Sequence, residues 1–149
     1  MPLIYADTSV LFAHFHPDDE LSRVVDSAVQ QDTPDFIYWS FLKFELRHNL
    51  RQANTDNNGT AAWRALRAAE NTRTRLRWQD LNTDKLIENA DHLSLQHSKG
   101  NGAGAADWLH VAAALKISFL AGFDEFWTGD KEQAAAATLA GLTTRLFKP

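Results

Sequence analysis

The segment Leu3-Ile4-Tyr5-Ala6-Asp7-Thr8-Ser9 begins with four apolar or aromatic side chains and then changes abruptly to three polar ones. A short, continuous apolar run is typical of a parallel strand that is buried on both faces. Aspartate, threonine and serine are residue types that cap the N-termini of helices. The segment therefore predicts a buried strand over 3–6 that leads directly into a helix.

The same alternation of short apolar strands and helices continues along the chain. Further strands are predicted over 35–39, 76–81, 125–127 and 142–147, and helices over 10–15, 18–30, 40–53, 60–73, 83–93, 105–116 and 130–140. Polar or glycine-rich loops are predicted over 54–59 and 100–104. This order predicts one α/β domain over 1–149, with a central parallel sheet flanked by helices.

The length and composition limit the kinds of fold and functional site that the chain can form. The chain has 149 residues, 44% of them apolar, and no cysteine. That length and apolar content suffice for a single core, and the lack of cysteine excludes disulfides, zinc–thiolate sites, iron–sulfur clusters and a cysteine nucleophile. The start carries no basic segment, and the longest apolar stretch, 111–123, is too short to span a bilayer. We therefore expect a soluble, cytoplasmic protein without a membrane partner.

Four acidic residues occupy positions at which an α/β fold binds ligands. Asp7 and Asp130 follow predicted strands, Asp107 lies in the first turn of a helix after a glycine loop, and Glu45 lies on the helix after the second strand. Singly, the aspartates also suit helix caps and Glu45 suits the polar edge of its helix. Together they predict a cluster at the carboxyl ends of the strands. Clustered carboxylates without cysteine favour Mg²⁺ or Mn²⁺, and such ions support hydrolytic phosphoryl transfer.

Four segments, in order, resemble the motifs of PIN-domain ribonucleases of the VapC toxin type. They are Ile4-Tyr5-Ala6-Asp7-Thr8-Ser9-Val10-Leu11, Ser40-Phe41-Leu42-Lys43-Phe44-Glu45-Leu46, Asp107-Trp108-Leu109-His110-Val111-Ala112-Ala113-Ala114 and Phe126-Trp127-Thr128-Gly129-Asp130. The third follows the pattern Asp-x-x-His-x-Ala-x-Ala. Each motif is short and tolerant, so the resemblance rests on the ordered set, which extends over essentially the whole chain.

The resemblance implies both a fold and an activity. It implies a three-layer domain and one or two Mg²⁺ or Mn²⁺ ions bound by Asp7, Glu45, Asp107 and Asp130. The implied reaction is endonucleolytic cleavage of single-stranded or looped RNA by the toxin of a type II toxin–antitoxin pair. An antitoxin partner and a homodimer are implied as well. Asp124 and Glu125 are less suitable as the fourth acid because they precede the strand.

Three hydroxyl side chains and a histidine lie beside these acids in the sequence. Thr8 and Ser9 are candidates to hydrogen-bond Asp7 or a metal-bound water, and Thr128 is the equivalent candidate for Asp130. Each also suits a helix-capping role. His110, three residues after Asp107, is a candidate general acid or metal ligand. Its alternative is a partly buried histidine that bonds the backbone.

The net charge of −4 is unevenly distributed. Residues 36–79 contain eight basic side chains, seven of them arginine, against three acidic ones, and both flanking segments are acidic. Arginine binds phosphate in a bidentate way and stacks on bases, so Arg67, Arg73 and Arg77 are candidates for RNA contact. The alternative is a solvated helix face. The five tryptophans are candidate stacking platforms for bases, but we expect most of them to pack in the core.

Two other functional classes compete with a nuclease. One is a domain of the same fold that binds RNA or a protein with little or no activity. The other is a different α/β phosphoryl enzyme, such as a receiver domain or a haloacid-dehalogenase-like phosphatase. A receiver needs a lysine at the end of its last strand, where this chain has only Lys148 near its end, and the phosphatase pattern Asp-x-Asp is absent at Asp7-Thr8-Ser9.

Overall fold

Five short strands form one all-parallel sheet in the computed structural model, which describes residues 1–149. The strands are β1 (Leu3–Ala6), β2 (Asp35–Tyr38), β3 (Leu76–Trp78), β4 (Glu125–Thr128) and β5 (Thr144–Leu146). Their order in the sheet is β3-β2-β1-β4-β5, so the first strand of the chain is the central one. The predicted α/β domain with a central parallel sheet is confirmed.

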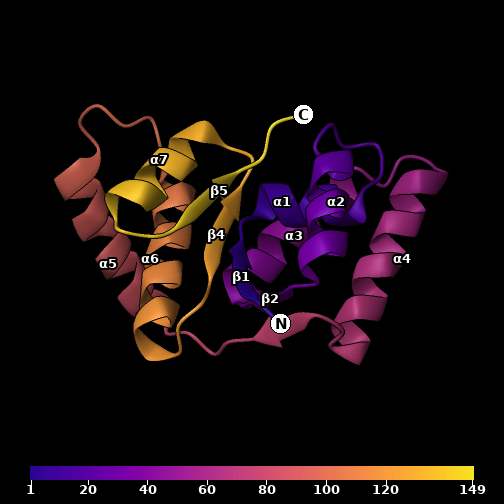
Figure 1. The fold of residues 1–149 in the computed structure, drawn as a ribbon, viewed down its shortest axis with the longest axis horizontal. Coiled ribbons are helices and arrows are strands. Elements are labelled where there is room, and N and C mark those ends of the chain that lie inside the picture. Colours follow the sequence, from indigo (N-terminus) through magenta and orange to yellow (C-terminus); the bar gives the residue numbers. More distant parts are fainter.

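The helices cover both faces of the sheet (Figure 1). They are α1 (Thr8–Phe15), α2 (Ser22–Asp32), α3 (Ser40–Gln52), α4 (Asn57–Thr72), α5 (Thr83–His97), α6 (Ala105–Leu120) and α7 (Lys131–Leu139). The strand order reverses direction after β3, and crossover connections between parallel strands are right-handed. Helices α1–α4 therefore lie on one face and α5–α7 on the other, which gives three layers. None of these helices combines the length and the apolar character needed to cross a membrane.

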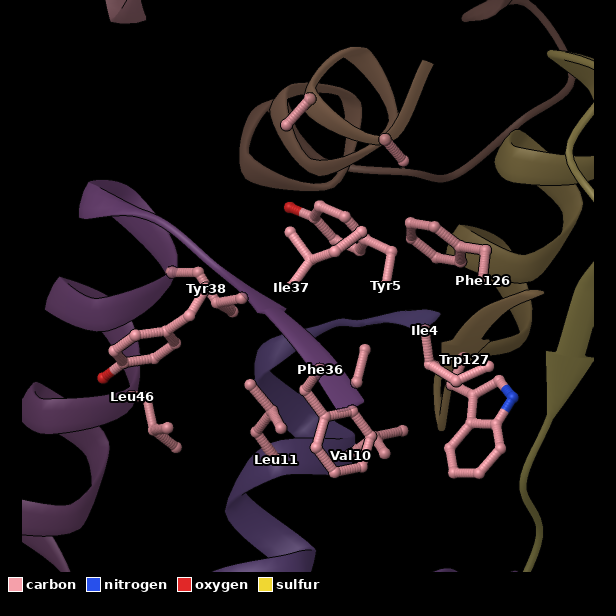
Figure 2. Close-up of a cluster of buried hydrophobic side chains, with 14 of the residues drawn as sticks. Ile4, Tyr5, Val10, Leu11, Phe36, Ile37, Tyr38, Leu46, Phe126 and Trp127 are labelled. Atoms are coloured by element: carbon pink, nitrogen blue, oxygen red, sulfur yellow. The ribbon is translucent and has the colours of Figure 1, made fainter. Parts of the chain in front are cut away.

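Alternating side chains of the central strands fill the two halves of the core (Figure 2). Tyr5, Ile37 and Phe126 point toward one helix layer, and the rings of Tyr5 and Phe126 stack with centroids 5.2 Å apart. Phe36 and Trp127 point toward the other layer, where their rings meet edge to face at 6.0 Å. Because both faces of these strands are buried, a continuous apolar run is the pattern that a sequence needs here.

Some predicted boundaries were wrong, and local hydrogen bonds explain two of the shifts. The predicted loop over 54–59 is shorter, because the Asp56 carboxylate accepts a hydrogen bond from the Gly59 N–H and starts α4 at Asn57. Helix α2 starts at Ser22 instead of residue 18, after a turn in which Asp19 caps the Leu21 N–H.

Other predicted boundaries also differ by one to four residues. Helix α1 begins two residues earlier than predicted, α5 and α6 extend beyond their predicted ends, and the predicted strands over 35–39, 76–81 and 142–147 are shorter in the structure. The N-cap of α5 is Asn82, directly before the predicted start of the helix at residue 83.

Gly59 allows a close approach between the start of α4 and the end of α3. A Cβ atom at this position would lie 2.3 Å from the Ala53 carbonyl oxygen and 2.8 Å from the Asn54 Cα. Both contacts are with backbone, so relief requires a helix to move. We expect Gly59→Ala to lower the free energy of unfolding by about 1–3 kcal/mol, measured by urea denaturation. The control Asn57→Ala, at an exposed position of the same helical turn, should change it by less than about 0.5 kcal/mol. Equal stability of Gly59→Ala and wild type would contradict this close approach of the two helices.

Candidate active site

Asp7 lies directly after the central strand, at the point where the strand order reverses. Its Oδ1 accepts hydrogen bonds from the Ser9 hydroxyl at 2.6 Å and from the Val10 N–H at 3.1 Å, so it caps α1 as well. Its Oδ2 accepts a short bond of 2.5 Å from the hydroxyl of Thr128 at the end of β4. The side chain is buried, and burial raises the pKa of Asp7 although these hydrogen bonds oppose the shift.

The turn after β4 connects Asp7 to Asp130. The Thr128 hydroxyl donates to Asp7 and accepts from the Asp130 N–H at 3.0 Å, and the Ser9 hydroxyl accepts from the Gly129 N–H at 3.0 Å. The Asp130 Oδ1 caps α7 by accepting from two N–H groups of its first turn, at 2.7 and 3.2 Å. The predicted hydrogen bond of the Thr128 hydroxyl to the Asp130 carboxylate is therefore wrong: Thr128 donates to Asp7.

Glu45 on α3 is fixed by residues from two other helices. Its Oε1 accepts from the Thr8 hydroxyl at 2.8 Å and pairs with His110 Nε2 at 2.5 Å. Burial alone would raise the pKa of Glu45, but the hydrogen bonds from His110 and from the Thr8 hydroxyl lower it below the ordinary value. Of the two hydroxyls predicted as candidates to bond Asp7, Ser9 does so, whereas Thr8 bonds Glu45 instead. Glu45 is held in its ionised form.

A buried hydrogen-bonded chain assigns the proton positions on His110. Trp39 Nε1, which can only donate, lies 2.9 Å from the Tyr5 hydroxyl, and that hydroxyl lies 2.7 Å from His110 Nδ1. With one lone pair used by Trp39, the Tyr5 hydroxyl satisfies its own proton by donating it to Nδ1. His110 is then the neutral tautomer that donates its Nε2–H to Glu45. Its partners are side chains, so the expected bond to the backbone is wrong.

Asp107 lies in the first turn of α6, where its Oδ2 accepts from the Gly104 N–H at 2.8 Å. It is partly buried. Burial raises its pKa, and the nearby charges of Asp130 and Glu45 raise it further. Asp107 is therefore close enough to Asp130 and Glu45 to feel their charges, and Thr128 joins Asp7 to the turn that carries Asp130.

The carboxylates retain oxygens for a ligand. Glu45 Oε2, Asp107 Oδ1 and Asp130 Oδ2 accept no hydrogen bond from the chain, whereas their other oxygens do. Four carboxylates without sulfur ligands are a donor set that suits a hard divalent cation. No group of three or more His, Asp or Glu side chains is already drawn together at metal-ligating spacing. The donor chemistry fits Mg²⁺ or Mn²⁺, and binding one requires rotation of side chains.

Sequence reasoning missed Tyr5 and Trp39. Both are fully buried, and both have side chains that suit the core, so nothing in the sequence separates them from their apolar neighbours. The available signal was chemical: a buried hydroxyl and a buried indole N–H each need a partner. A histidine on a helix predicted to cover the same sheet was one candidate partner.

The three arginines predicted to contact RNA differ in their surroundings. Arg67 pairs with Glu70 at 2.7 Å, and Arg77 pairs with Asp35 at 2.6 Å. Arg73 is exposed and makes no ion pair. It ends α4 in the left-handed conformation, with φ of 53°.

Comparison with known proteins supports the fold. No protein-family model and no curated protein sequence matches the chain. Among solved structures, VapC20 of Mycobacterium tuberculosis, described as a Sarcin-Ricin loop cleaving toxin, matches with a TM-score of 0.66 and 20% identity over 89% of this chain and 94% of that one. The chain shares this fold. FitAcB from Neisseria gonorrhoeae matches with a TM-score of 0.56 and 19% identity over 95% of each chain. The predicted three-layer PIN-like architecture is confirmed.

The Tyr5 hydroxyl should be energetically coupled to Trp39. Tyr5→Phe leaves the Trp39 N–H and His110 Nδ1 without partners in the core, which costs about 1–3 kcal/mol of unfolding free energy. Trp39→Phe removes one of those orphaned groups. In a double-mutant cycle measured by urea denaturation, the two changes should therefore be non-additive by about 0.5–3 kcal/mol. Additive effects would show that the buried chain does not act as a unit.

The buried Asp7 carboxylate should make stability depend on pH. Because burial raises its pKa above 3.8, the folded protein binds the Asp7 proton more tightly than the unfolded chain does. Ionised Asp7 therefore opposes folding above its folded-state pKa, and this effect disappears as the pH falls below 3.8. In EDTA, the unfolding free energy of Asp7→Asn minus that of wild type should increase with pH across this window. Asp80→Asn, at an exposed position, is the control, and a difference for Asp7→Asn that falls with pH would contradict the assignment.

Proposed function

We propose that the protein is a metal-dependent endoribonuclease and the toxin of a type II toxin–antitoxin pair. The observation that supports the proposal is that Asp7 and Asp130 follow strands at the strand-order reversal, while Glu45, Asp107 and Asp130 each keep a carboxylate oxygen that accepts no hydrogen bond from the chain. The fold is that of a toxin described as cleaving the sarcin–ricin loop, which supports RNA as the substrate. A phosphodiester is hydrolysed at this site in our proposal.

The four acids would hold Mg²⁺ or Mn²⁺. When bound, such an ion lowers the pKa of a water molecule and neutralises the charge that develops on the phosphate. Asp7 is the least mobile of the four carboxylates, because three hydrogen bonds and burial hold it in place. Asp107 and Asp130 each keep one oxygen free while the other caps a helix.

His110 is assigned a positioning role in this proposal. Both ring nitrogens are engaged, Nδ1 by the Tyr5 hydroxyl and Nε2 by Glu45. The ring therefore orients Glu45 through the bond to Oε1. Glu45 Oε2 is left without a hydrogen bond from the chain. No serine, threonine or histidine is left as an activated nucleophile by these contacts, so water is the attacking group and no covalent enzyme intermediate forms.

The partners follow from the same proposal. An antitoxin chain and a second copy of this chain are proposed from the resemblance, and a neighbouring reading frame for a small DNA-binding protein would identify the antitoxin. The alternative is an RNA- or protein-binding domain with little or no nuclease activity. Metal dependence separates the two functions.

The decisive experiment is RNA cleavage by the purified chain with Mg²⁺ or Mn²⁺. We expect wild type to cleave, and we expect Asp7→Asn and Asp107→Asn to lose cleavage by at least about a hundredfold, because removal of a metal-binding carboxylate removes the site's charge stabilisation. The control Asp80→Asn removes one exposed carboxylate outside the site and should retain activity.

Thermal melting gives an independent readout of metal binding. Mn²⁺ should raise the melting temperature of wild type and of Asp80→Asn, and should leave that of Asp7→Asn unchanged. Full cleavage by Asp7→Asn would reject the nuclease site. Absence of both cleavage and a metal-dependent shift in wild type would favour the binding domain.

A further inference from the structure

Trp78 is exposed, whereas three of the other four tryptophans are buried. It is the last residue of the edge strand β3, and 48% of its surface is exposed, whereas Trp39, Trp108 and Trp127 are at most 1% exposed. Its ring meets Tyr38 edge to face, with centroids 6.2 Å apart. Packing in the core explains the buried indoles, and it leaves half of the Trp78 surface unexplained.

Two hollows share Trp78 and Lys43 as a common wall. One hollow, of about 320 Å³, is lined by Ser40, Lys43, Phe44, Arg47, Arg51 and Trp78, with no acidic residue. The other, of about 270 Å³, is lined by Tyr38, Lys43, Glu70, Arg73, Leu76 and Trp78. We call Lys43, Phe44, Arg51, Arg73 and Trp78 the Trp78 surface. It combines aromatic rings with positive charge, the combination used to bind single-stranded nucleic acid.

The cations of the Trp78 surface are not committed to carboxylates. Glu70, the acid of the second hollow, is already neutralised by Arg47 at 2.6 Å and Arg67 at 2.7 Å. Lys43 and Arg51 instead lie over aromatic rings, Lys43 Nζ at 5.6 Å from the Trp78 ring centroid and the Arg51 guanidinium carbon at 5.0 Å from that of Trp63. Neither of them nor Arg73 forms an ion pair, so all three can contact phosphate.

The Trp78 surface lies at the same sheet edge as the candidate active site. Trp78 ends β3 and Asp7 follows β1, and parallel strands end at the same edge. One strand, β2, separates β1 from β3, which places the two strand ends about 10 Å apart. Helix α3 also connects them, since it carries Lys43 on the Trp78 side and Glu45 in the site.

We propose that the Trp78 surface binds the single-stranded RNA that enters the active site, with a base stacked on Trp78 and phosphates on Lys43, Arg51 and Arg73. The proposal rests on the proposed function and adds to it the route of the substrate. Charge complementarity favours RNA over a second copy of the chain. A symmetric dimer through this surface would place the same unpaired cations opposite each other.

Binding of a labelled single-stranded RNA to the whole chain in EDTA tests the stacking contact without cleavage. Measured by fluorescence anisotropy, Trp78→Ala should weaken binding about tenfold, and Trp78→Phe should keep most of the affinity because it keeps a ring. Phe119→Ala is the matched control, since Phe119 is 86% exposed on α6 at the other face of the sheet. Melting temperatures verify that each variant is folded.

The salt dependence of binding tests the cations. Lys43→Gln and Arg73→Gln should each reduce the slope of log affinity against log salt by about 0.7, the value for one phosphate contact to a single strand. Lys116→Gln, which removes an exposed cation of α6 on the other face of the sheet, should leave the slope unchanged. Wild-type affinity in folded Trp78→Ala, or a dimer that Trp78→Ala converts to monomer without loss of RNA affinity, would overturn the inference.

The outcomes also distinguish this inference from the proposed function. A chain that binds RNA through Trp78 but never cleaves it would reject the nuclease and keep the surface. A chain that cleaves RNA with Mn²⁺ but binds it equally with and without the Trp78 ring would reject only the surface.

Discussion

Burial of the Asp7 carboxylate at the end of β1 removes it from water, and hydrogen bonds from Ser9, Val10 and Thr128 replace the lost hydration. A buried charge of this kind is tolerated only where such partners are in place. Those partners come from α1 and from the end of β4, so one carboxylate couples the central strand to the elements beside it. Burial raises the pKa of Asp7 in spite of these hydrogen bonds, so a cation beside the carboxylate would stabilise its ionised form.

The rest of the site follows from the position of β1 between two helix layers. Alternate residues of a strand point to opposite faces, and β1 supplies Tyr5 to the layer of α6 while the residue after Asp7 reaches α3 through its hydroxyl. Glu45 comes from α3 and His110 from α6, which lie on opposite faces of the sheet. Their hydrogen bond therefore joins the two helix layers directly. Only beyond the strand ends, at the reversal of strand order, do helices from both faces meet in this way.

Sequence reasoning predicted the helices and strands and proposed the four acids. It did not predict which hydroxyl groups donate hydrogen bonds to which acids. Periodicity and capping residues act along the chain, and they placed Asp7 directly after one strand and Asp130 just past another, as the structure has them. The hydrogen-bond partners of two hydroxyl groups, by contrast, depend on contacts between residues far apart in the sequence. Thr8 donates to Glu45, 37 residues away, and Thr128 donates to Asp7, 121 residues away. Adjacency in sequence therefore predicted the acceptor of Ser9 correctly, but not those of Thr8 and Thr128. The pairing of Arg67 with Glu70 follows helical spacing and was accessible from sequence, whereas that of Arg77 with Asp35 needs the parallel pairing of β3 beside β2.

The net charge of −4 misrepresents what a ligand meets at the surface. In ion pairs such as Arg77 with Asp35 and Arg145 with Asp32, the two opposite charges largely cancel at a distance. What remains is an unequal distribution at one edge of the sheet, with uncompensated carboxylates beside β1 and β4 and uncompensated cations beside β3. A polyanion is attracted by the second group and repelled by the first unless a cation is bound there. In the proposed function, divalent metal and RNA would therefore depend on each other at this edge, because the metal would remove the repulsion that the acids impose on the approaching phosphate.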